Sequence, residues 1–276
     1  HTVKNYMVSL RQFVLWLDIS IEQVTPRTIC AYIDSLMARG LKPKTINCHL
    51  ERIRQFYYYL VEEGNFERPN PVKYSYHLKM PKPLARNLQE EQIDRLLGTI
   101  KNPRDRAIFL LMLRCGLRVS EVATLSLADI DPLRQRLTIH DGKWRKDRIV
   151  YISDDALEAL GDYLKIRPDT PTQNLLLVQK GTCRGLALSI RGIQKRMERY
   201  AKKTGLNISC HHLRHTMATQ MLNADAQLVS IQALLGHSWI TTTQRYCRVS
   251  NPKVERDYHR AMVKVMKRTT DNDFQT

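Results

Sequence analysis

Four residues in the last third of the chain have side chains suited to phosphoryl transfer. His211 and Arg214 are three positions apart, which puts them on one face of a helix. His237 follows a Leu-Leu-Gly helix stop, and Tyr246 lies nine residues beyond it. Together these residues supply two imidazoles, a guanidinium and a phenol, which the transfer of a phosphoryl group onto a tyrosine needs.

Two cations upstream add to the set. Arg118 lies in GLRVSE, after a predicted helix stop at Gly116 and before Ser120, a candidate N-cap of the next short helix. Fixed arginines stabilise the negative charge that builds on the non-bridging oxygens when a phosphodiester is attacked. Lys143 lies in HDGKWRKDR, where a lysine at a hairpin turn can protonate the departing sugar oxygen. We prefer Lys143 to Lys146 because it directly follows the turn glycine.

Each residue also has an ordinary structural interpretation when it is taken singly. Arg118 alone is typical of a salt-bridged surface arginine, and Lys143 alone of a solvated turn. His237 is equally typical of a helix-end contact, and Tyr246 of a packed aromatic ring. The joint spacing, rather than any single residue, favours the chemistry.

Composition supports a polyanionic partner. The 276 residues include 44 Lys and Arg against 27 Asp and Glu, a formal net charge of +17, which favours nucleic acid first and an anionic membrane second. No apolar run approaches the roughly 18 residues that a membrane span needs, which disfavours the membrane. The polar opening HTVKNYMVSL predicts no secretory signal, and its lack of a Met suggests that a short native N-terminus is missing.

The cysteines predict neither a metal site nor a disulfide framework. All six are scattered, without a CxxC pair or zinc-ligand spacing. Reduced and mostly buried thiols in a cytosolic protein are the better interpretation. They are Cys30, Cys48, Cys115, Cys183, Cys210 and Cys247.

The elements that must position these residues fall into two predicted domains. Apolar residues at helical spacing predict three helices over 3–17, 26–39 and 44–63, which form a small bundle over 1–67. Prolines interleaved with lysines over 68–83 then interrupt the pattern, which favours a basic interdomain linker over an ordinary surface loop.

The second predicted domain, 84–276, is mainly helical. Alternation about a glycine turn predicts a β-hairpin over 136–152, the one sheet of the domain. The predicted helices cover 88–100, 103–116, 153–164, 189–203, 210–222, 226–235 and 252–266, and 103–116 is apolar enough to be buried.

Two of these helices have faces suited to partners. The helix over 189–203 carries six basic residues against Glu198, which in so basic a chain favours contact with DNA over a merely solvated face. The helix over 252–266 begins with Asn251 as N-cap and carries an apolar stripe. That stripe either packs on its own domain or docks on a neighbouring protomer; it contains Val254, Tyr258, Met262, Val265 and Met266.

The blocks GLRVSE, HDGKWRKDR, HHLRHTMAT, LLGH and TTTQRY resemble those of the tyrosine recombinases, the phage integrase family, nearest in style to Xer-type and transposon-encoded members. The resemblance extends to TVKNYMVSLRQFVLWL and KPKTINCHLERIRQFYYYL in the first domain, and so covers essentially the whole chain. It implies a mainly α fold, with a SAM-like helical core-binding bundle before a mostly helical catalytic domain with a small antiparallel sheet.

The resemblance also implies roles for the candidate residues. Arg118 and Arg214 would bind the scissile phosphate, and Lys143 would be the general acid for the 5′ oxygen. His211 would handle the proton of the nucleophile Tyr246. His237 would hydrogen-bond the phosphate. His212 stands where the family varies, and His215 looks structural.

The implied reaction is site-specific DNA recombination through a 3′-phosphotyrosyl intermediate and a Holliday junction, for integration, excision or resolution, without a metal or another cofactor. The implied partners are double-stranded DNA with an inverted-repeat site, held in a C-shaped clamp, and three further copies in a tetramer on two duplexes that exchanges C-terminal helices. Such a protein acts in the cytoplasm at the nucleoid, not at a membrane. The predicted DNA contacts are Lys42, Lys44, Arg52, Arg54, Lys79, Lys82, Arg191, Lys195, Arg196 and Arg199.

Two other functions share part of this pattern. A type IB topoisomerase uses the same Arg-Lys-Arg-His-Tyr chemistry to relax DNA without exchanging strands, and the N-terminal bundle disfavours it. A DNA-binding relative that has lost catalysis is disfavoured by the intact set of six residues.

Overall fold

A computed structural model describes residues 2–64, 68–80, 87–140 and 147–236, together with 240, 243, 256, 258, 259 and 262. Lys143, His237 and Tyr246 lie outside the described residues, as do Lys82, Cys247 and most of the predicted helix over 252–266. The chain divides into two compact units, 1–83 and 84–276, each with its own apolar core. None of the described helices is long and apolar enough to cross a bilayer.

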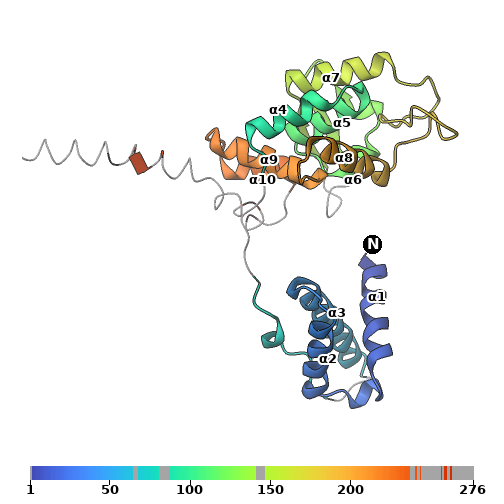
Figure 1. The fold of residues 1–276 in the computed structure, drawn as a ribbon, viewed down its shortest axis with the longest axis vertical. Helices are drawn as coiled ribbons and strands as arrows, with labels where there is room; N and C mark the ends of the chain where they lie inside the picture. The colour runs from blue at the N-terminus through green and yellow to red at the C-terminus, as the bar shows by residue number, and fades with distance from the viewer. Residues whose placement is uncertain are drawn as a thin grey trace, which may run out of the picture. The chain divides into compact units, whose positions relative to one another are not determined.

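Unit 1 is a bundle of α1 (Thr2–Trp16), α2 (Pro26–Ala38) and α3 (Pro43–Glu62), with a short 3-10 helix at Ile21–Gln23 (Figure 1). The three predicted helices are therefore confirmed. Thr25 accepts a hydrogen bond from the backbone N–H of Thr28 at 3.3 Å, the N-cap that the Thr-Pro pair predicts. The core consists chiefly of Phe13, Ile29, Tyr32, Leu36, Ile46, Leu50, Ile53 and Tyr57.

Part of the predicted linker folds onto α3. The Asn47 amide bonds both the carbonyl and the N–H of Leu78, at 2.9 and 2.8 Å, and Asn70 donates to the carbonyl of Arg54 at 2.8 Å. Val72 is buried, and a 3-10 helix spans Tyr74–Tyr76. These contacts make residues 70–78 an extension of unit 1.

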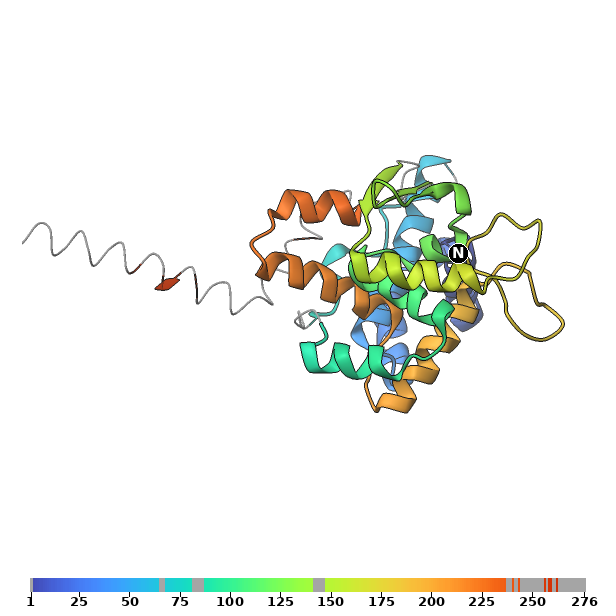
Figure 2. The ribbon, with the colours of Figure 1, turned by 90° about the horizontal axis from the view of Figure 1, so that it is seen from above.

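Unit 2 is organised around α5 (Pro103–Arg114), which packs between α7 (Asp154–Lys165) and α9 (Cys210–Asn223) (Figures 1 and 2). Every residue of α5 from Arg104 to Leu113 except Arg106 is buried, as the apolar pattern predicts. The other helices are α4 (Glu90–Thr99), α6 (Val119–Thr124), α8 (Ile190–Thr204) and α10 (Leu228–Leu235), and α4 packs on α8.

A small antiparallel sheet in the order β1-β2-β3 completes unit 2. Its strands are β1 (Ile130–Asp131), β2 (Arg136–Ile139) and β3 (Arg148–Tyr151), so the predicted hairpin is confirmed and β1 is an addition. Leu137 pairs with Val150, and both side chains are buried. Arg148 is two residues from Val150 and therefore lies on the same, core-facing side of β3.

The prediction of mostly buried cysteines is wrong for the cysteines that the structure describes. Cys115 and Cys210 are buried, whereas Cys30 and Cys183 are exposed and Cys48 is half-buried. Burial raises the pKa of Cys115 to about 12 and that of Cys210 to about 11. Both buried thiols are therefore protonated, unreactive packing groups near neutral pH.

Candidate active site

Arg118 lies at the start of α6, where it is the N-cap, so the prediction of Ser120 as the cap is wrong. The reason is Glu121, whose Oε2 accepts the backbone N–H of Arg118 at 2.7 Å, so the helix starts two residues earlier than predicted. The Arg118 guanidinium also donates to Glu121 Oε1 at 2.7 Å and keeps 29% of its side-chain area exposed. It is paired and still accessible.

Glu121 is the carboxylate at which three arginines meet. Arg148 binds it through two parallel hydrogen bonds of 2.9 Å, and Arg214 Nη1 lies 3.9 Å from its Oε2. Burial alone would raise the pKa of Glu121, but the hydrogen bonds from Arg148 and Arg118 outweigh it and lower the pKa to about 2. Three guanidinium groups against one carboxylate leave this cluster with a net charge of +2.

The same three arginines hold the C-terminal end of α10. Leu234 O accepts from Arg148 Nε at 2.8 Å, Leu235 O accepts from Arg214 Nη2, and Gly236 O accepts from Arg118 Nη2 at 3.3 Å. The last carbonyls of a helix lack intrahelical partners and carry partial negative charge, so cations stabilise them. The helix stop before His237 is thereby fixed to the arginine cluster.

Arg214 is the most enclosed member of the cluster. It lies on α9, only 1% exposed, and its Nη1 donates to Gly116 O at 2.5 Å. Gly116 lies in the turn after α5 and has a φ of +65°. Gly236 lies at the end of α10 and has a φ of +59°. Two left-handed glycine turns, predicted as helix stops, thus bring Gly116 O and Leu235 O to one guanidinium.

His211 lies one turn before Arg214 on α9 and is exposed. Its ring meets that of the buried His215 edge-on, with 4.2 Å between the ring centroids. His212 instead accepts the N–H of Ser209 on its Nδ1 at 3.1 Å, in the first turn of α9. The three neighbouring histidines therefore have different environments, and His211 is the one that solvent reaches most freely.

The base of the hairpin that carries Lys143 is held by charged groups. His140 Nδ1 lies 3.0 Å from Asp147 Oδ2, and its Nε2 lies 3.3 Å from Asp129 Oδ1. Arg148 follows Asp147 and is bound to Glu121. Lys143 itself lies outside the described residues, but the residue that follows Asp147 in the chain, Arg148, is a member of the arginine cluster.

The predicted DNA contacts differ in how freely they can reach a ligand. Arg52 donates to Ser9 Oγ at 2.6 Å, Arg54 pairs with Glu51, and Arg196 pairs with the buried Asp105 at 3.2 Å. Arg191 is exposed and pairs with Glu198 at 2.7 Å. The other described residues of this set are also exposed: Lys42, Lys44, Lys79, Lys195 and Arg199.

Sequence reasoning missed Glu121 and Arg148. Glu121 was visible only as the last letter of GLRVSE, three residues after Arg118, which is the spacing of a carboxylate that caps a helix start. Arg148 had a clearer signal, because the alternation of β3 places a charged residue on the apolar side of a strand. A charge at such a position needs a partner, and Glu121 is that partner.

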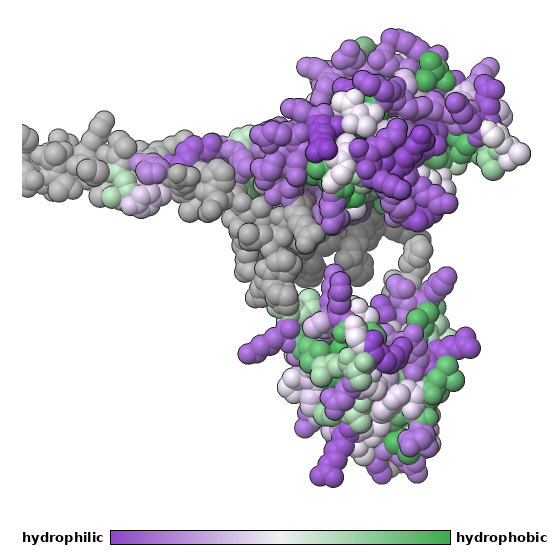
Figure 3. Space-filling view, in the orientation of Figure 1, coloured by the Kyte–Doolittle hydropathy of each residue, from purple (hydrophilic) through white to green (hydrophobic). Residues whose placement is uncertain are grey.

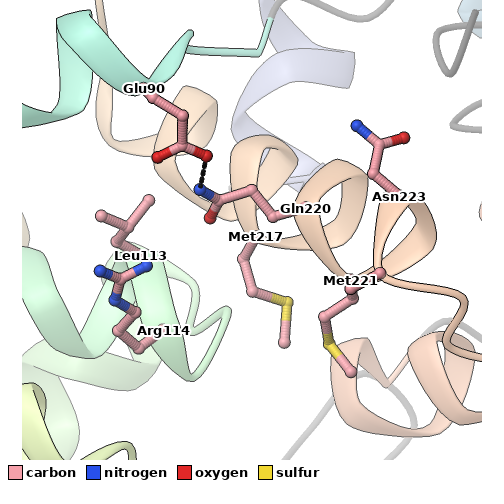
Figure 4. Close-up of a pocket in the computed structure, with 8 residues that line it drawn as sticks. Glu90, Leu113, Arg114, Met217, Gln220, Met221 and Asn223 are labelled. Carbon is pink, nitrogen blue, oxygen red and sulfur yellow. Dashed lines mark hydrogen bonds between the residues drawn. The ribbon is translucent and has the colours of Figure 1, made fainter. Parts of the chain in front are cut away.

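A separate cleft of about 560 Å³ opens between α4, α5 and α9. Met217 and Met221 point into it from α9, and Gln220 donates to Glu90 at 3.0 Å across its rim (Figure 4). Its other lining residues are Leu113, Arg114, Asn223 and Ala224. The lining is mixed, and its two methionines form an adaptable apolar patch within it.

The chain matches two family models. The phage integrase family matches residues 86–252, and the N-terminal SAM-like domain of phage integrases matches residues 1–64. Tyrosine recombinase XerC of Shewanella amazonensis is 35% identical over 252 residues, which are 89% of this chain and 84% of that protein. Tyrosine recombinase XerA of Pyrococcus horikoshii is 31% identical over 246 residues, 88% of this chain and 83% of that protein.

Solved structures show the same fold. The crystal structure of XerA recombinase aligns with a TM-score of 0.59 at 26% identity, over 94% of this chain and 91% of that one. The Tn1549 transposon integrase in complex with transposon right end DNA aligns with a TM-score of 0.77 at 19% identity, over 89% and 88%. At 19% identity, the similarity to the Tn1549 integrase shows a shared fold and nothing more.

The chain belongs to the phage integrase family, the tyrosine recombinases. It is a DNA strand-transferring, site-specific recombinase. The expected fold, mainly α with a SAM-like N-terminal bundle and one small antiparallel sheet, is confirmed.

Proposed function

We propose that Tyr246 attacks the scissile phosphate and forms a 3′-phosphotyrosyl link, releasing a 5′ hydroxyl. The phenol loses its proton as the new P–O bond forms, and the departing 5′ oxygen gains one. A 5′ hydroxyl from the partner duplex then attacks the link and restores a phosphodiester. Exchange of one pair of strands gives a Holliday junction, and exchange of the second pair resolves it.

The observation that carries this proposal is the joining of Arg118 and Arg214 through Glu121 and the last carbonyls of α10. A phosphodiester carries one negative charge, and attack by an oxygen nucleophile adds a second in the transition state. The cluster's net charge of +2 is matched to that transition state more closely than to the ground state. Cations that are held in place once DNA is bound need no further reorganisation when the charge develops.

Lys143, His211 and His237 take the remaining roles in this proposal. Lys143 protonates the leaving 5′ oxygen, His211 takes the proton of Tyr246, and His237 donates a hydrogen bond to the phosphate. The exposed ring of His211, one helical turn from Arg214, supports its part. Arg214 is enclosed, so phosphate reaches it only if the groups around it move apart when DNA binds.

We infer further that both units bind the duplex, in the cytoplasm at the nucleoid. Exposed Lys42 and Lys44 on unit 1, and Lys195 and Arg199 on α8 of unit 2, support this because they are charged and unburied. The exposed, hydrophilic face of unit 2 is seen in Figure 3. Arg52, Arg54 and Arg196 must exchange the partners they have here if they are to bind phosphates.

We propose that four protomers assemble on two duplexes and that each passes its C-terminal segment to a neighbour. The cleft of α4, α5 and α9 supports this, because its methionines suit an apolar helical stripe. Arg256 donates to Asn223 O at 3.1 Å and to Asp225 at 2.8 Å. Arg256 therefore contacts the end of α9 of its own chain, at Asn223, which also lines the cleft.

The nucleophile is tested with a nicked suicide substrate, in which cleavage releases a short strand that carries the freed 5′ hydroxyl. That strand dissociates, so the phosphotyrosyl link cannot be religated. The parent should accumulate a covalent 3′ adduct in the presence of EDTA, and Tyr246→Phe should form none. That change removes one oxygen and keeps the ring, so specific binding should persist in the variant. An adduct in Tyr246→Phe, or no adduct in the parent, contradicts the proposal.

Strand exchange needs a separate measurement. With two labelled duplexes, a recombinase yields junctions and recombinant products. An enzyme of the topoisomerase type relaxes supercoiled plasmid without joining the two duplexes. Relaxation alone, with no recombinant product, would replace the proposed function by that alternative.

A further inference from the structure

Arg148 is a charged residue on the core-facing side of a strand. It pairs with Ile139 of β2 and shares its side of β3 with Val150, and both of those side chains are buried. Only 10% of the Arg148 side chain is exposed. Its aliphatic stem passes Gly236 so closely that a Cβ there would lie 3.1 Å from Arg148 Cδ. The glycine therefore leaves room for the arginine as well as ending the helix.

Each nitrogen of the Arg148 guanidinium has a protein partner. Nε donates to Leu234 O at 2.8 Å, and Nη1 and Nη2 donate to the two oxygens of Glu121 at 2.9 Å. Arg118 contrasts with it, because nearly a third of the Arg118 side chain is exposed to solvent. Arg148 is thus arranged to hold protein groups, whereas Arg118 is arranged to meet a ligand.

We propose that Arg148 is a positioning residue for DNA cleavage. It fixes Glu121, which in turn orients Arg118 beside Arg214, and it ties the end of α10 to the strand that follows the Lys143 turn. This inference rests on the proposed function, because it concerns how that site is held in its reactive geometry. Arg148 itself touches neither the phosphate nor the nucleophile.

The geometry requires an arginine rather than any cation. Two parallel bonds to a carboxylate and a third bond to a carbonyl need the planar fork of a guanidinium, which a lysine ammonium lacks. A lysine at this position would keep the charge but hold Glu121 through one point contact. Glu121, and with it Arg118, could then rotate, and a misplacement of about 1 Å in such a site costs on the order of 10²-fold in rate.

The test compares Arg148→Lys with the parent in single-turnover cleavage of the nicked suicide substrate at saturating DNA. We expect adduct formation to slow by about 10²-fold, with specific binding changed by less than about threefold. The parent protein is measured first, because the absence of an adduct in the parent would overturn the proposed function itself. If the parent forms the adduct and Arg148→Lys forms it equally fast, only the proposed role of Arg148 is overturned.

A matched control separates positioning from general stability. Arg167 is also partly buried and donates to backbone oxygens of Leu175, Thr172 and Asn174, at 3.1, 2.6 and 2.7 Å. Arg167→Lys should lose stability to a similar extent and cleave within about twofold of the parent. If both variants slow cleavage in proportion to their loss of stability, Arg148 is merely structural.

The route through Glu121 is tested by a double variant. If Arg148 acts by orienting Glu121, Arg148→Lys combined with Glu121→Gln should be no slower than the slower single variant, because both changes break one link. Rate losses that multiply would overturn that route. Should Arg148→Lys fail to fold, Arg148→Gln, which keeps a long neutral donor, is measured in the same way and with the same expectations.

Discussion

At the scale of single residues, Glu121 is the group on which the arginine cluster depends. A buried carboxylate is costly unless it is charged and fully paired, and Glu121 accepts four hydrogen bonds from Arg118 and Arg148. Without it, three guanidinium groups would repel one another in a poorly solvated site. The carboxylate therefore lowers the cost of assembling the cations while leaving the net positive charge that a phosphate needs.

This arrangement predicts how stability depends on pH. The pKa of Glu121 is about 2 in the folded protein and near 4.5 when the chain is unfolded, so ionisation favours the folded state above about pH 4.5. That contribution, about 3 kcal/mol, is lost as the pH falls from 4.5 towards 2. Glu121→Gln should therefore be clearly less stable than the parent at pH 7, and the difference should shrink below pH 4.5.

Urea unfolding of both proteins at pH 7, 5 and 3.5 measures this difference. Asp162→Asn is the control, because Asp162 is an exposed carboxylate paired with Lys165, and such pairs contribute little. Its difference from the parent should stay small at every pH. A Glu121→Gln difference that is constant from pH 7 to 3.5 would mean that the charge of Glu121 does not stabilise the fold.

The residue types at the site could be predicted from the sequence, but the contacts between them could not. The spacing of His211 and Arg214 on a helix is local, and the glycine stops at Gly116 and Gly236 are local too. The bonds from Arg148 to Glu121 and Leu234 span 27 and 86 residues. Periodicity carries no information about which partner a buried charge finds at such distances.

At the scale of elements, two helix ends determine where the arginines lie. Gly116 ends the turn after α5, and a Cβ on it would lie 3.0 Å from Leu235 Cδ2 and 3.1 Å from Met217 Sδ. That turn therefore packs directly against the end of α10, whose last carbonyls accept hydrogen bonds from Arg118, Arg148 and Arg214. The apolar sequence of α5 predicted its burial, but this close approach of two turns arises only in the tertiary fold.

Gly116→Ala should destabilise the protein for two reasons. The φ of +65° disfavours any residue with a Cβ by about 1–2 kcal/mol, and the added methyl overpacks the contact with Leu235 and Met217 by about 1–3 kcal/mol. Gly161→Ala is the matched control, because no heavy atom lies within 4 Å of its added Cβ in α7. It should gain up to about 1 kcal/mol.

Thermal unfolding of the two variants separates these cases, since their shifts should have opposite signs. The added methyl of Gly116→Ala also pushes on the helix end that bonds Arg214. Its cleavage rate should therefore fall at temperatures where the variant remains folded. A Gly116→Ala protein as stable as the parent would show that the two turns yield easily and do not fix the cluster.

At the scale of the whole molecule, the chain consists of two units with separate cores and an excess of positive charge. The prolines over 68–83 predicted a change of domain near the boundary at 83 and 84. They did not predict that residues 70–78 pack on α3, because the bonds between Asn47 and Leu78 join positions 31 residues apart. Local backbone rules thus locate the break in helical structure, whereas side-chain pairing decides to which unit the segment belongs.

The two units also expose apolar surface of different kinds. On α1, the side chains of Val3, Met7 and Val14 are exposed and lie along one side of the helix. Figure 3 shows apolar side chains on the surface of unit 1. In unit 2, by contrast, Met217 and Met221 line a concave cleft. A cleft with an apolar patch inside a polar rim is suited to take up an amphipathic helix, and we propose the C-terminal stripe as its occupant.

Deleting the chain from Val254 onward tests this assignment at the level of the assembly. The truncated protein should bind a single site nearly as tightly as the parent, because phosphate contacts come from Lys and Arg elsewhere in the chain. It should fail to pair two sites, because it lacks the stripe that we propose docks on a neighbour. Sedimentation of the protein with DNA carrying one or two sites distinguishes single-site complexes from synaptic ones.

A new charge in the cleft should have the same effect on assembly as the deletion, without shortening the chain. Met221→Glu buries a carboxylate where the apolar stripe would dock, so synapsis should fall by at least about tenfold while single-site binding persists. Val229→Glu is the matched control, since Val229 is 65% exposed on α10 and outside the cleft lining, and it should assemble like the parent.

If the truncated protein still pairs and recombines two sites, the exchange of C-terminal segments is wrong. If Met221→Glu assembles normally while the deletion does not, the stripe docks on a surface other than this cleft.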